Sequence, residues 1–191
     1  MDGQSKARVL IAMGVCGAGK SALARTLAAR LGLALVDADD HHSEEARAAM
    51  SRGEALSDAE RLPWLDRVGV AAAAAAQASG GVVIACSALR RIYRDRLRGH
   101  LPSACFIHLS GARDLIAGRL KSRRDHFVGV GLLDSQLATL EPLGHDESGI
   151  VVDVTASLDL LSEAVLRKMG DAAAVSLETG PVPDRLETRQ N

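Results

Sequence analysis

Short apolar runs alternate with segments of helical apolar spacing along most of the chain. Leu23, Leu27 and Leu31, for example, recur at the spacing that places side chains on one face of a helix. The alternation favours βαβ units with right-handed crossovers, which form a parallel sheet with helices on both faces. Ligands of such α/β proteins bind at the carboxyl ends of the strands. The apolar runs that predict strands are residues 9–13, 33–36, 82–86, 104–109 and 150–154.

The longest predicted helix contains a six-alanine run and ends at Gly80 and Gly81. Its start has two interpretations. Ser57 and Glu60 have capping-box spacing, whereas Pro63 is most favourable at the first helical position. The other predicted helices are the segment from Ser21, residues 44–50, residues 90–98, the segment from about residue 112, residues 132–140 and a last segment that Ser157 caps.

The 191-residue length suits one domain with a single hydrophobic core. Beyond Gly170 no apolar period is sustained, and Pro181 and Pro183 disfavour regular secondary structure. We therefore expect a folded domain over residues 1–170 and a loosely ordered tail over residues 171–191.

Composition narrows the class of protein and its cellular location. With 47% hydrophobic residues, 25% charged residues and a formal net charge of -1, the chain resembles an ordinary globular protein and lacks the basic charge of a nucleic-acid-binding domain. No apolar stretch has bilayer-spanning length, and the N-terminus lacks the pattern of a secretory signal. Cys16, Cys86 and Cys105 have no metal-ligand spacing, which favours buried reduced thiols. We therefore expect a cytoplasmic protein with neither a nucleic-acid nor a membrane partner.

A glycine-rich motif follows the first predicted strand. Residues 14–21, GVCGAGKS, match the phosphate-binding pattern GxxxxGK(S/T) at every position and precede a predicted helix. The glycines let backbone N–H groups converge on phosphate oxygens, and the helix N-terminus adds its dipole. Lys20 can reach the β- and γ-phosphates of ATP, and the Ser21 hydroxyl can bind Mg²⁺. The motif predicts ATP binding but leaves the phosphate acceptor open.

Three carboxylates lie at the end of the second predicted strand. Asp37 closes the apolar run, and Asp39 and Asp40 follow it. At this edge of a parallel sheet a carboxylate faces the phosphate loop, where it can orient hydrated Mg²⁺ or accept a proton from an attacking hydroxyl. The alternative is a solvated acidic turn that caps a helix, which suits Asp40 better than Asp37.

Basic residues are candidates for binding the transferred phosphate, because phosphoryl transfer develops negative charge that guanidinium groups stabilise. A single arginine such as Arg61 is more often a solvated surface residue. A basic cluster beside a glycine-containing segment instead predicts a closing lid. The cluster consists of Arg119, Lys121, Arg123 and Arg124.

Five segments are distinctive when taken together. They are GVCGAGKSALA from Gly14, DADDHHSEEARAAM from Asp37, LSDAERLPWL from Leu56, CSALRRIYRDRLR from Cys86 and HFVGVGLLDSQLATLEPLG from His126. With them the chain resembles the gluconate kinases of the shikimate-kinase-like P-loop group, from about residue 9 to about residue 161. The resemblance implies an α/β P-loop NTPase fold with a five-stranded parallel sheet, a short mobile basic lid and a homodimer.

The resemblance also implies an activity, the transfer of the ATP γ-phosphate to the terminal hydroxyl of D-gluconate to give 6-phosphogluconate, with Mg²⁺ as a cofactor. It implies that Asp37 and Ser21 support Mg²⁺, that Asp39 holds the acceptor hydroxyl, and that Arg61 binds the gluconate carboxylate. The implied nucleotide-binding residues are Gly14, Cys16, Gly17, Ala18, Gly19, Lys20, Ser21, Ala22, Arg119 and Arg124. The implied catalytic residues are Lys20, Asp37, Asp39 and Arg123, and the implied substrate-binding residues are Asp39, His42, Arg61, Ser87 and Arg90.

Alternatives to these interpretations stay open. A kinase for another small hydroxy acid, such as shikimate, would be expected to have three glycines at positions 86–88, where this chain has CSA. A nucleoside monophosphate kinase is disfavoured by the short lid, and a nucleotide-binding regulatory module would hydrolyse ATP without any added metabolite. Arg61 could instead form a surface ion pair with Asp58, in which case Arg90 becomes the candidate for the carboxylate.

Overall fold

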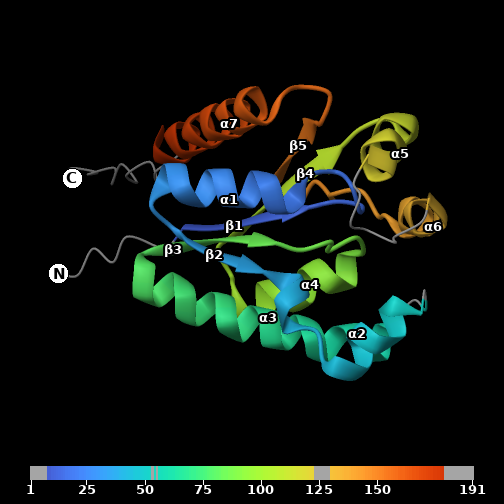
Figure 1. The fold of residues 1–191 in the computed structure, drawn as a ribbon. Coiled ribbons are helices and arrows are strands. Elements are labelled where there is room, and N and C mark those ends of the chain that lie inside the picture. The colour runs from blue at the N-terminus through green and yellow to red at the C-terminus, as the bar shows by residue number, and fades with distance from the viewer. Residues whose placement is uncertain (1–7, 53, 55, 123–129, 179–191) are drawn as a thin grey trace, which may run out of the picture.

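The computed structural model describes residues 8–52, 54, 56–122 and 130–178 of the chain. Its five strands form one parallel sheet in the order β2-β3-β1-β4-β5 (Figure 1). The strands are β1 Arg8–Met13, β2 Ala34–Asp37, β3 Gly81–Ala85, β4 Ala104–Ser110 and β5 Gly149–Asp153. Every apolar run that predicts a strand is therefore a strand, with small shifts at the ends.

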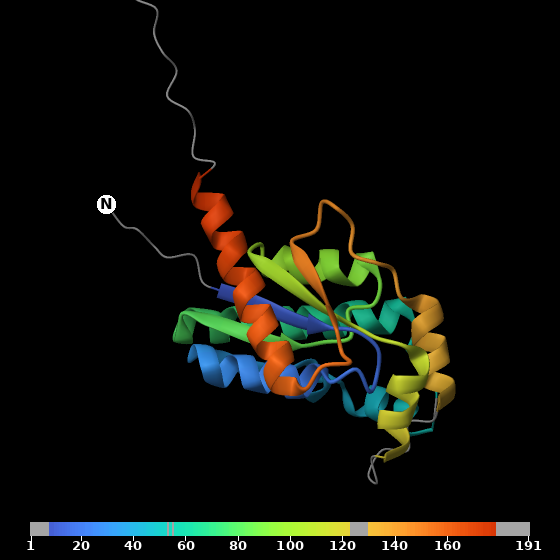
Figure 2. The same cartoon turned by 90° about the horizontal axis from the view of Figure 1, so that it is seen from above.

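Helices cover both faces of this sheet (Figure 1). They are α1 Lys20–Leu31, the 3-10 helix η1 Ala38–His41, α2 Glu44–Ser51, α3 Asp58–Ser79, α4 Arg91–His100, α5 Arg113–Ser122, α6 Val130–Thr139 and α7 Leu158–Glu178. α1 and α7 lie over one face, and α3 and α4 pack together over the other. Figure 2 shows α5 and α6 side by side beyond the end at which the strands finish. Within the ranges given above, no helix is long and apolar enough to cross a membrane.

The two faces of the sheet bury separate hydrophobic clusters, because successive side chains of a strand point to opposite faces. In β1, Leu10 packs in one cluster with Leu23 of α1, whereas the next residue, Ile11, packs in the other with Trp64 of α3. The predicted architecture, a parallel sheet with helices on both faces, is confirmed.

The start of α3 agrees with the capping-box interpretation. The Ser57 hydroxyl accepts a hydrogen bond from the Glu60 N–H, and the Glu60 carboxylate accepts one from the Ser57 N–H. Pro63 therefore lies inside the helix and does not begin it. At the other end, Gly80 alone caps the helix, with a φ of 71°. Our assignment of Gly81 to the helix end was wrong, because Gly81 is the first residue of β3 and pairs with Arg8.

The last helix extends past the boundary that we predicted for the folded domain. α7 begins after Ser157, whose hydroxyl accepts a hydrogen bond from the Leu160 N–H, and it continues beyond Gly170 to Glu178. The remaining part of the predicted tail, residues 179–191, lies outside the described residues.

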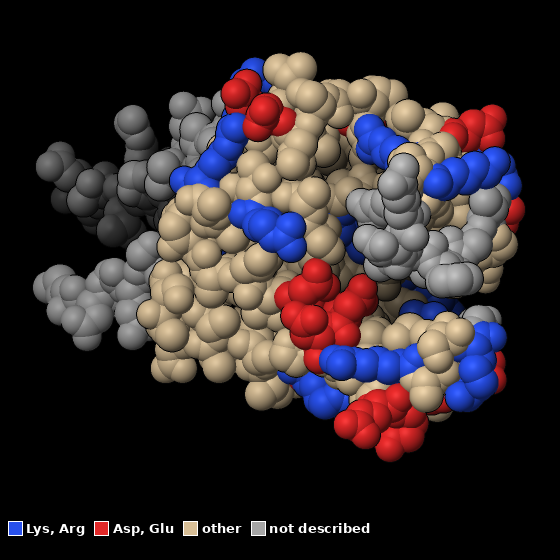
Figure 3. All heavy atoms as spheres, viewed as in Figure 1, with Lys and Arg blue, Asp and Glu red and all other residues tan. Residues whose placement is uncertain are grey.

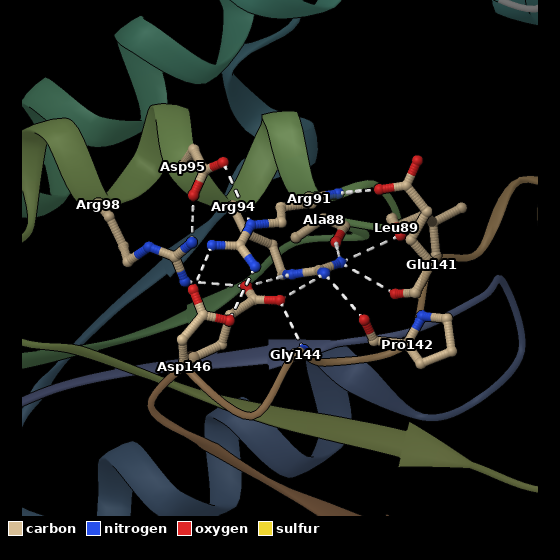
Figure 4. A network of polar contacts seen from close by, with 11 residues as sticks. Ala88, Leu89, Arg91, Arg94, Asp95, Arg98, Glu141, Pro142, Gly144 and Asp146 are labelled. Carbon is tan, nitrogen blue, oxygen red and sulfur yellow. Dashed lines mark hydrogen bonds and ion pairs between the residues drawn. The ribbon is translucent and has the colours of Figure 1, made fainter.

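A buried ion pair joins α4 to the segment that precedes β5 (Figure 4). Arg94 and Glu147 are fully buried in their side chains, and they form two parallel hydrogen bonds of 2.7 and 2.8 Å. The remaining N–H groups of Arg94 donate to the backbone carbonyls of Ala88, Leu89, Glu141 and Pro142. Ala88 has a φ of 43°, a strained value for a residue with a side chain, so Arg94 also holds an unfavourable turn in place.

The hydrogen bond from Arg94 lowers the pKa of Glu147 to about 2, despite the opposing effect of burial. Breaking a buried pair of this kind costs about 3–5 kcal/mol, because the remaining charge loses its partner. We therefore expect Arg94→Met to lower the free energy of unfolding by about that amount, as measured by urea denaturation. Arg96→Met on the same helix is the control. Arg96 pairs with Asp66 at the exposed surface, so its loss should cost at most about 1 kcal/mol. Equal losses in the two variants would contradict this account.

Candidate active site

The phosphate loop connects β1 to α1, and its conformation depends on glycines. Gly14 has a φ of 139°, and a β-carbon there would lie 2.8 Å from the Leu109 carbonyl oxygen. Gly17 has a φ of 79°, and a β-carbon there would lie 2.6 Å from the Leu120 side chain. The Gly14 N–H donates to the Ser87 carbonyl, 3.2 Å away. The loop thus contacts the segment after β3, β4 and α5.

Lys20 is the first residue of α1, directly after Gly19, which caps the helix without any side-chain hydrogen bond. The first N–H groups of α1 thus have no capping side chain, and such groups form a site for an anion. Ser21 and Ala22 belong to the same turn. The Lys20 ammonium donates to the Val15 carbonyl at 3.1 Å. Burial lowers the pKa of Lys20, while the charges of Asp39 and, more weakly, Asp37 oppose the shift.

Asp37 and Asp39 lie near this lysine, as the sequence predicts. β2 pairs with β3 and β3 with β1, so the end of β2 lies at the same edge of the sheet as the phosphate loop. The Asp37 carboxylate caps η1 by accepting a hydrogen bond of 3.2 Å from the Asp39 N–H. Figure 3 shows acidic side chains gathered on the visible face near the end of β2. The pattern places two carboxylates beside the loop that is expected to bind phosphate.

His42 stacks on Trp64, with ring centroids 4.3 Å apart and ring planes 10° from parallel. Trp64 is in turn fixed by a hydrogen bond of 2.8 Å from its indole N–H to the Ala38 carbonyl. The Nδ1 atom of His42 is buried and has no hydrogen-bond partner among the described residues. Burial lowers the pKa of His42, although Asp39 opposes the shift from 3.8 Å away. The imidazole is therefore neutral near pH 7.

Arg61 and Arg90 both lie near the ring of Tyr93 but differ in their partners. Their guanidinium carbons are 5.9 and 5.7 Å from the centre of the Tyr93 ring. Arg90 forms ion pairs with Asp58 and with Glu141, and the Tyr93 hydroxyl donates to the other Asp58 oxygen at 2.6 Å. Our alternative prediction, a surface ion pair between Arg61 and Asp58, is therefore wrong. The two carboxylate oxygens of Asp58 accept hydrogen bonds from Arg90 and Tyr93 instead.

The Nε atom of Arg61 donates to the Leu56 carbonyl at 3.0 Å. Its two terminal nitrogens form no hydrogen bond or ion pair with the described parts of the chain. Of the two arginines, Arg61 is thus the one whose guanidinium edge is available to a carboxylate.

The remaining predicted site residues lie in three places. Ser87 lies between β3 and α4, and its carbonyl holds the phosphate loop. Arg119 on α5 donates to the Val154 carbonyl just after β5, at 2.5 Å. Arg123 and Arg124, the centre of the predicted lid, lie outside the described residues.

Sequence reasoning missed several side chains of this site. Trp64 and Tyr93 carried no assigned role, although both are aromatic residues in a chain with only 2% aromatics. Gln136 on α6 was also missed. Its side-chain carbonyl accepts a hydrogen bond of 2.6 Å from the Cys16 N–H in the phosphate loop.

Comparisons with known proteins agree with this geometry. A family model described as an AAA domain matches residues 9–143. The gluconokinase of Gluconobacter oxydans (strain 621H) is 40% identical over 162 residues, which cover 85% of this chain and 91% of that protein. The thermoresistant gluconokinase of Escherichia coli (strain K12) is 40% identical over 152 residues, which cover 79% of this chain and 87% of that protein. The crystal structure of a gluconokinase from Sinorhizobium meliloti 1021 has a TM-score of 0.81 at 32% identity, and the alignment covers 92% of this chain and 99% of that one.

The close approach of Gly14 to β4 generates a prediction about stability. Gly14→Ala should destabilise the protein by about 1–3 kcal/mol or more, since it adds a strained φ to a clash with backbone. Gly118→Ala is the matched control. Gly118 lies in α5, where an added β-carbon meets nothing within 4 Å, so alanine should stabilise the protein by about 0.5–1 kcal/mol. Thermal unfolding of both variants checks the opposite signs, and a harmless Gly14→Ala would contradict the packing described for the loop.

Proposed function

The chain belongs to the gluconokinase family, and on that premise we propose that it transfers the γ-phosphate of ATP to the terminal hydroxyl of D-gluconate. The observation that carries the proposal is the arrangement around Lys20. Lys20 follows the phosphate loop, and the charges of Asp37 and Asp39 at the end of β2 act on its ammonium. The product is 6-phosphogluconate.

The nucleotide binds along the phosphate loop. Backbone N–H groups of the loop and of the first turn of α1 donate to the phosphate oxygens, and the glycines allow the positive φ angles that the loop conformation requires. Lys20 gives up its bond to the Val15 carbonyl and binds the β- and γ-phosphates. Its positive charge stabilises the negative charge that develops in the transition state.

Mg²⁺ is a further part of the proposal. Ser21 offers a hydroxyl oxygen and Asp37 a carboxylate oxygen, and both are hard ligands of the kind that Mg²⁺ prefers. One Asp37 oxygen accepts the hydrogen bond from the Asp39 N–H, which orients the carboxylate. The cation, when bound, neutralises charge on the phosphates.

Asp39 receives the acceptor hydroxyl of gluconate. Its side chain is exposed, and its charge opposes the lowering of the Lys20 pKa by burial. An exposed carboxylate beside the phosphate loop can orient the hydroxyl and take its proton. The resemblance to gluconate kinases also implies a substrate-binding role for His42, whose Nε2 atom lies 3.8 Å from the Asp39 carboxylate.

Arg61 binds the gluconate carboxylate, because its terminal nitrogens are available while Arg90 is neutralised by two carboxylates. The resemblance to gluconate kinases implies that Arg90 and Ser87 also lie on the substrate side. On the nucleotide side, Arg119 and Arg124 contact ATP, and Arg123 stabilises the transferred phosphate from the lid. These lid roles rest on the resemblance to gluconate kinases.

We also infer that the enzyme works in the cytoplasm as a homodimer, without a nucleic-acid or membrane partner. Its three cysteines are free thiols, which suits a reducing compartment. Dimerisation rests on the resemblance to gluconate kinases, and light scattering of the purified protein tests it.

Release of ADP over a panel of acceptors tests the function. We expect turnover with gluconate and little turnover with shikimate, glycerate or nucleoside monophosphates. Lys20→Met should lower turnover by about 10³-fold or more, because it removes a charge that stabilises the transition state. The fold should survive, since Lys20 contributes only one hydrogen bond to the loop. Robust turnover of shikimate with none of gluconate would overturn the proposal.

Arg61 generates a prediction about substrate selectivity. Arg61→Ala should raise the KM for gluconate sharply and leave the KM for ATP nearly unchanged, since removing one partner of a desolvated charge pair costs about 2–5 kcal/mol. Arg61→Lys should restore part of the loss, because an ammonium cannot form two parallel hydrogen bonds with a carboxylate. The control is Arg96→Ala, which breaks an exposed ion pair with Asp66. Equal KM values for gluconate in the wild type and both Arg61 variants would show that another residue binds the gluconate carboxylate.

A further inference from the structure

Asp39 lies in η1, just beyond the last residue of β2 that pairs in the sheet. The register of β2 with β3 ends where Asp37 lies opposite Ala85, and η1 begins at the next residue. The Asp39 side chain is 87% exposed, so its own packing does little to fix it. The position of this carboxylate therefore depends on what holds the backbone of η1.

Helix α3 holds η1 at both of its ends. The indole N–H of Trp64 donates to the carbonyl of Ala38, the first residue of η1, at 2.8 Å. The Nε atom of Arg67 donates to the carbonyl of His41, the last residue of η1, at 3.1 Å. The bond from Trp64 is buried, whereas the bond from Arg67 is exposed, and water can replace an exposed bond. Trp64 is therefore the stronger of the two attachments.

The indole of Trp64 contacts the chain on both sides of Asp39. Its N–H binds Ala38, the residue before Asp39, and its ring stacks on His42 with the centroids 4.3 Å apart. The Nε2 atom of His42 lies 3.8 Å from the Asp39 carboxylate. Trp64 itself is only 2% exposed and packs in the hydrophobic cluster between α3 and the sheet. A side chain fixed in the core thus determines where this part of the site lies.

We propose that Trp64 is a positioning residue for phosphoryl transfer, which holds η1 so that the Asp39 carboxylate meets the acceptor hydroxyl in the required orientation. Trp64 acts through Ala38 and His42. The inference rests on the proposed function, in which Asp39 receives that hydroxyl. Orientation contributes strongly to catalysis, because a misplacement of about 1 Å can cost about 10²-fold in rate.

Trp64→Phe separates the hydrogen bond from the ring, because phenylalanine can still stack on His42 but has no N–H donor. Turnover of gluconate should fall by about 10- to 100-fold, with the KM for ATP nearly unchanged. Val82→Ala is the control. Val82 is fully buried in the same cluster but lies at the start of β3, away from the strand ends that η1 follows. This variant should unfold at a lower temperature and keep near-normal turnover.

A double-mutant cycle with Asp39→Asn tests whether Trp64 acts through Asp39. Asp39→Asn alone should lower turnover by about 10²- to 10⁴-fold. In that background Trp64→Phe should add little further loss, because the effects of residues that act as a unit are not additive. A full additional loss in the double variant would mean that Trp64 supports the fold in general, and it would overturn the inference alone.

The inference would also be wrong if Trp64→Phe kept near-normal turnover, or if Val82→Ala lost as much turnover as Trp64→Phe. If Trp64→Phe did not fold, benzothienylalanine can replace the only tryptophan of the chain. This analogue keeps the shape of the ring and lacks the N–H donor, so it should lower turnover, and normal turnover would contradict the inference. Unchanged turnover in Asp39→Asn would instead overturn the proposed role of Asp39, and the inference with it.

Discussion

The site depends on one steric constraint, the approach of the phosphate loop to β4. At Gly14 the backbone lies so close to the Leu109 carbonyl that no β-carbon fits. At Gly17 the Leu120 side chain takes the space that a β-carbon would need. The loop is thereby held between the segment after β3, β4 and α5. The start of α1, which no side chain caps, follows directly.

The groups around the loop divide into two sets with complementary charge. Lys20 carries the positive charge beside the loop, and the charges of Asp37 and Asp39 at the end of β2 act on it. Arg61 is a second cation, and Asp58 keeps Arg90 occupied. In the proposed function Lys20 binds the phosphate donor and Arg61 binds the acidic acceptor, so the two substrates do not share a cation.

The buried pair of Arg94 and Glu147 acts on the backbone beside the phosphate loop, and Figure 4 shows the contacts of Arg94 with that backbone. Arg94 binds the carbonyls of Ala88 and Leu89, which follow Ser87, the residue that holds Gly14. The buried guanidinium of Arg94 thus fixes the turn after β3, and this turn holds Gly14 of the phosphate loop. Buried ion pairs need not add stability, but they favour one arrangement of the segments that they join.

The sequence predicted what local rules determine. The strands, the phosphate loop and the carboxylates at the end of β2 follow from apolar periodicity and motif spacing, and the capping box at Ser57 follows from the preference of its residue types. Partners far apart in the chain were not predictable. Arg94 belongs to a segment that resembles a charged surface helix, and its partner Glu147 lies 53 residues away. The pairing of Asp58 with Arg90 and the bond from Cys16 to Gln136 likewise depend on how the helices pack.

The central claim is that this site phosphorylates the terminal hydroxyl of gluconate, which is carried by a CH₂ group. The phosphorus NMR spectrum of the product tests this claim directly. The account predicts a phosphate monoester signal split into a triplet by the two protons of a terminal CH₂ group. A doublet, which marks a phosphate on a CH group, or a signal from inorganic phosphate alone would contradict it.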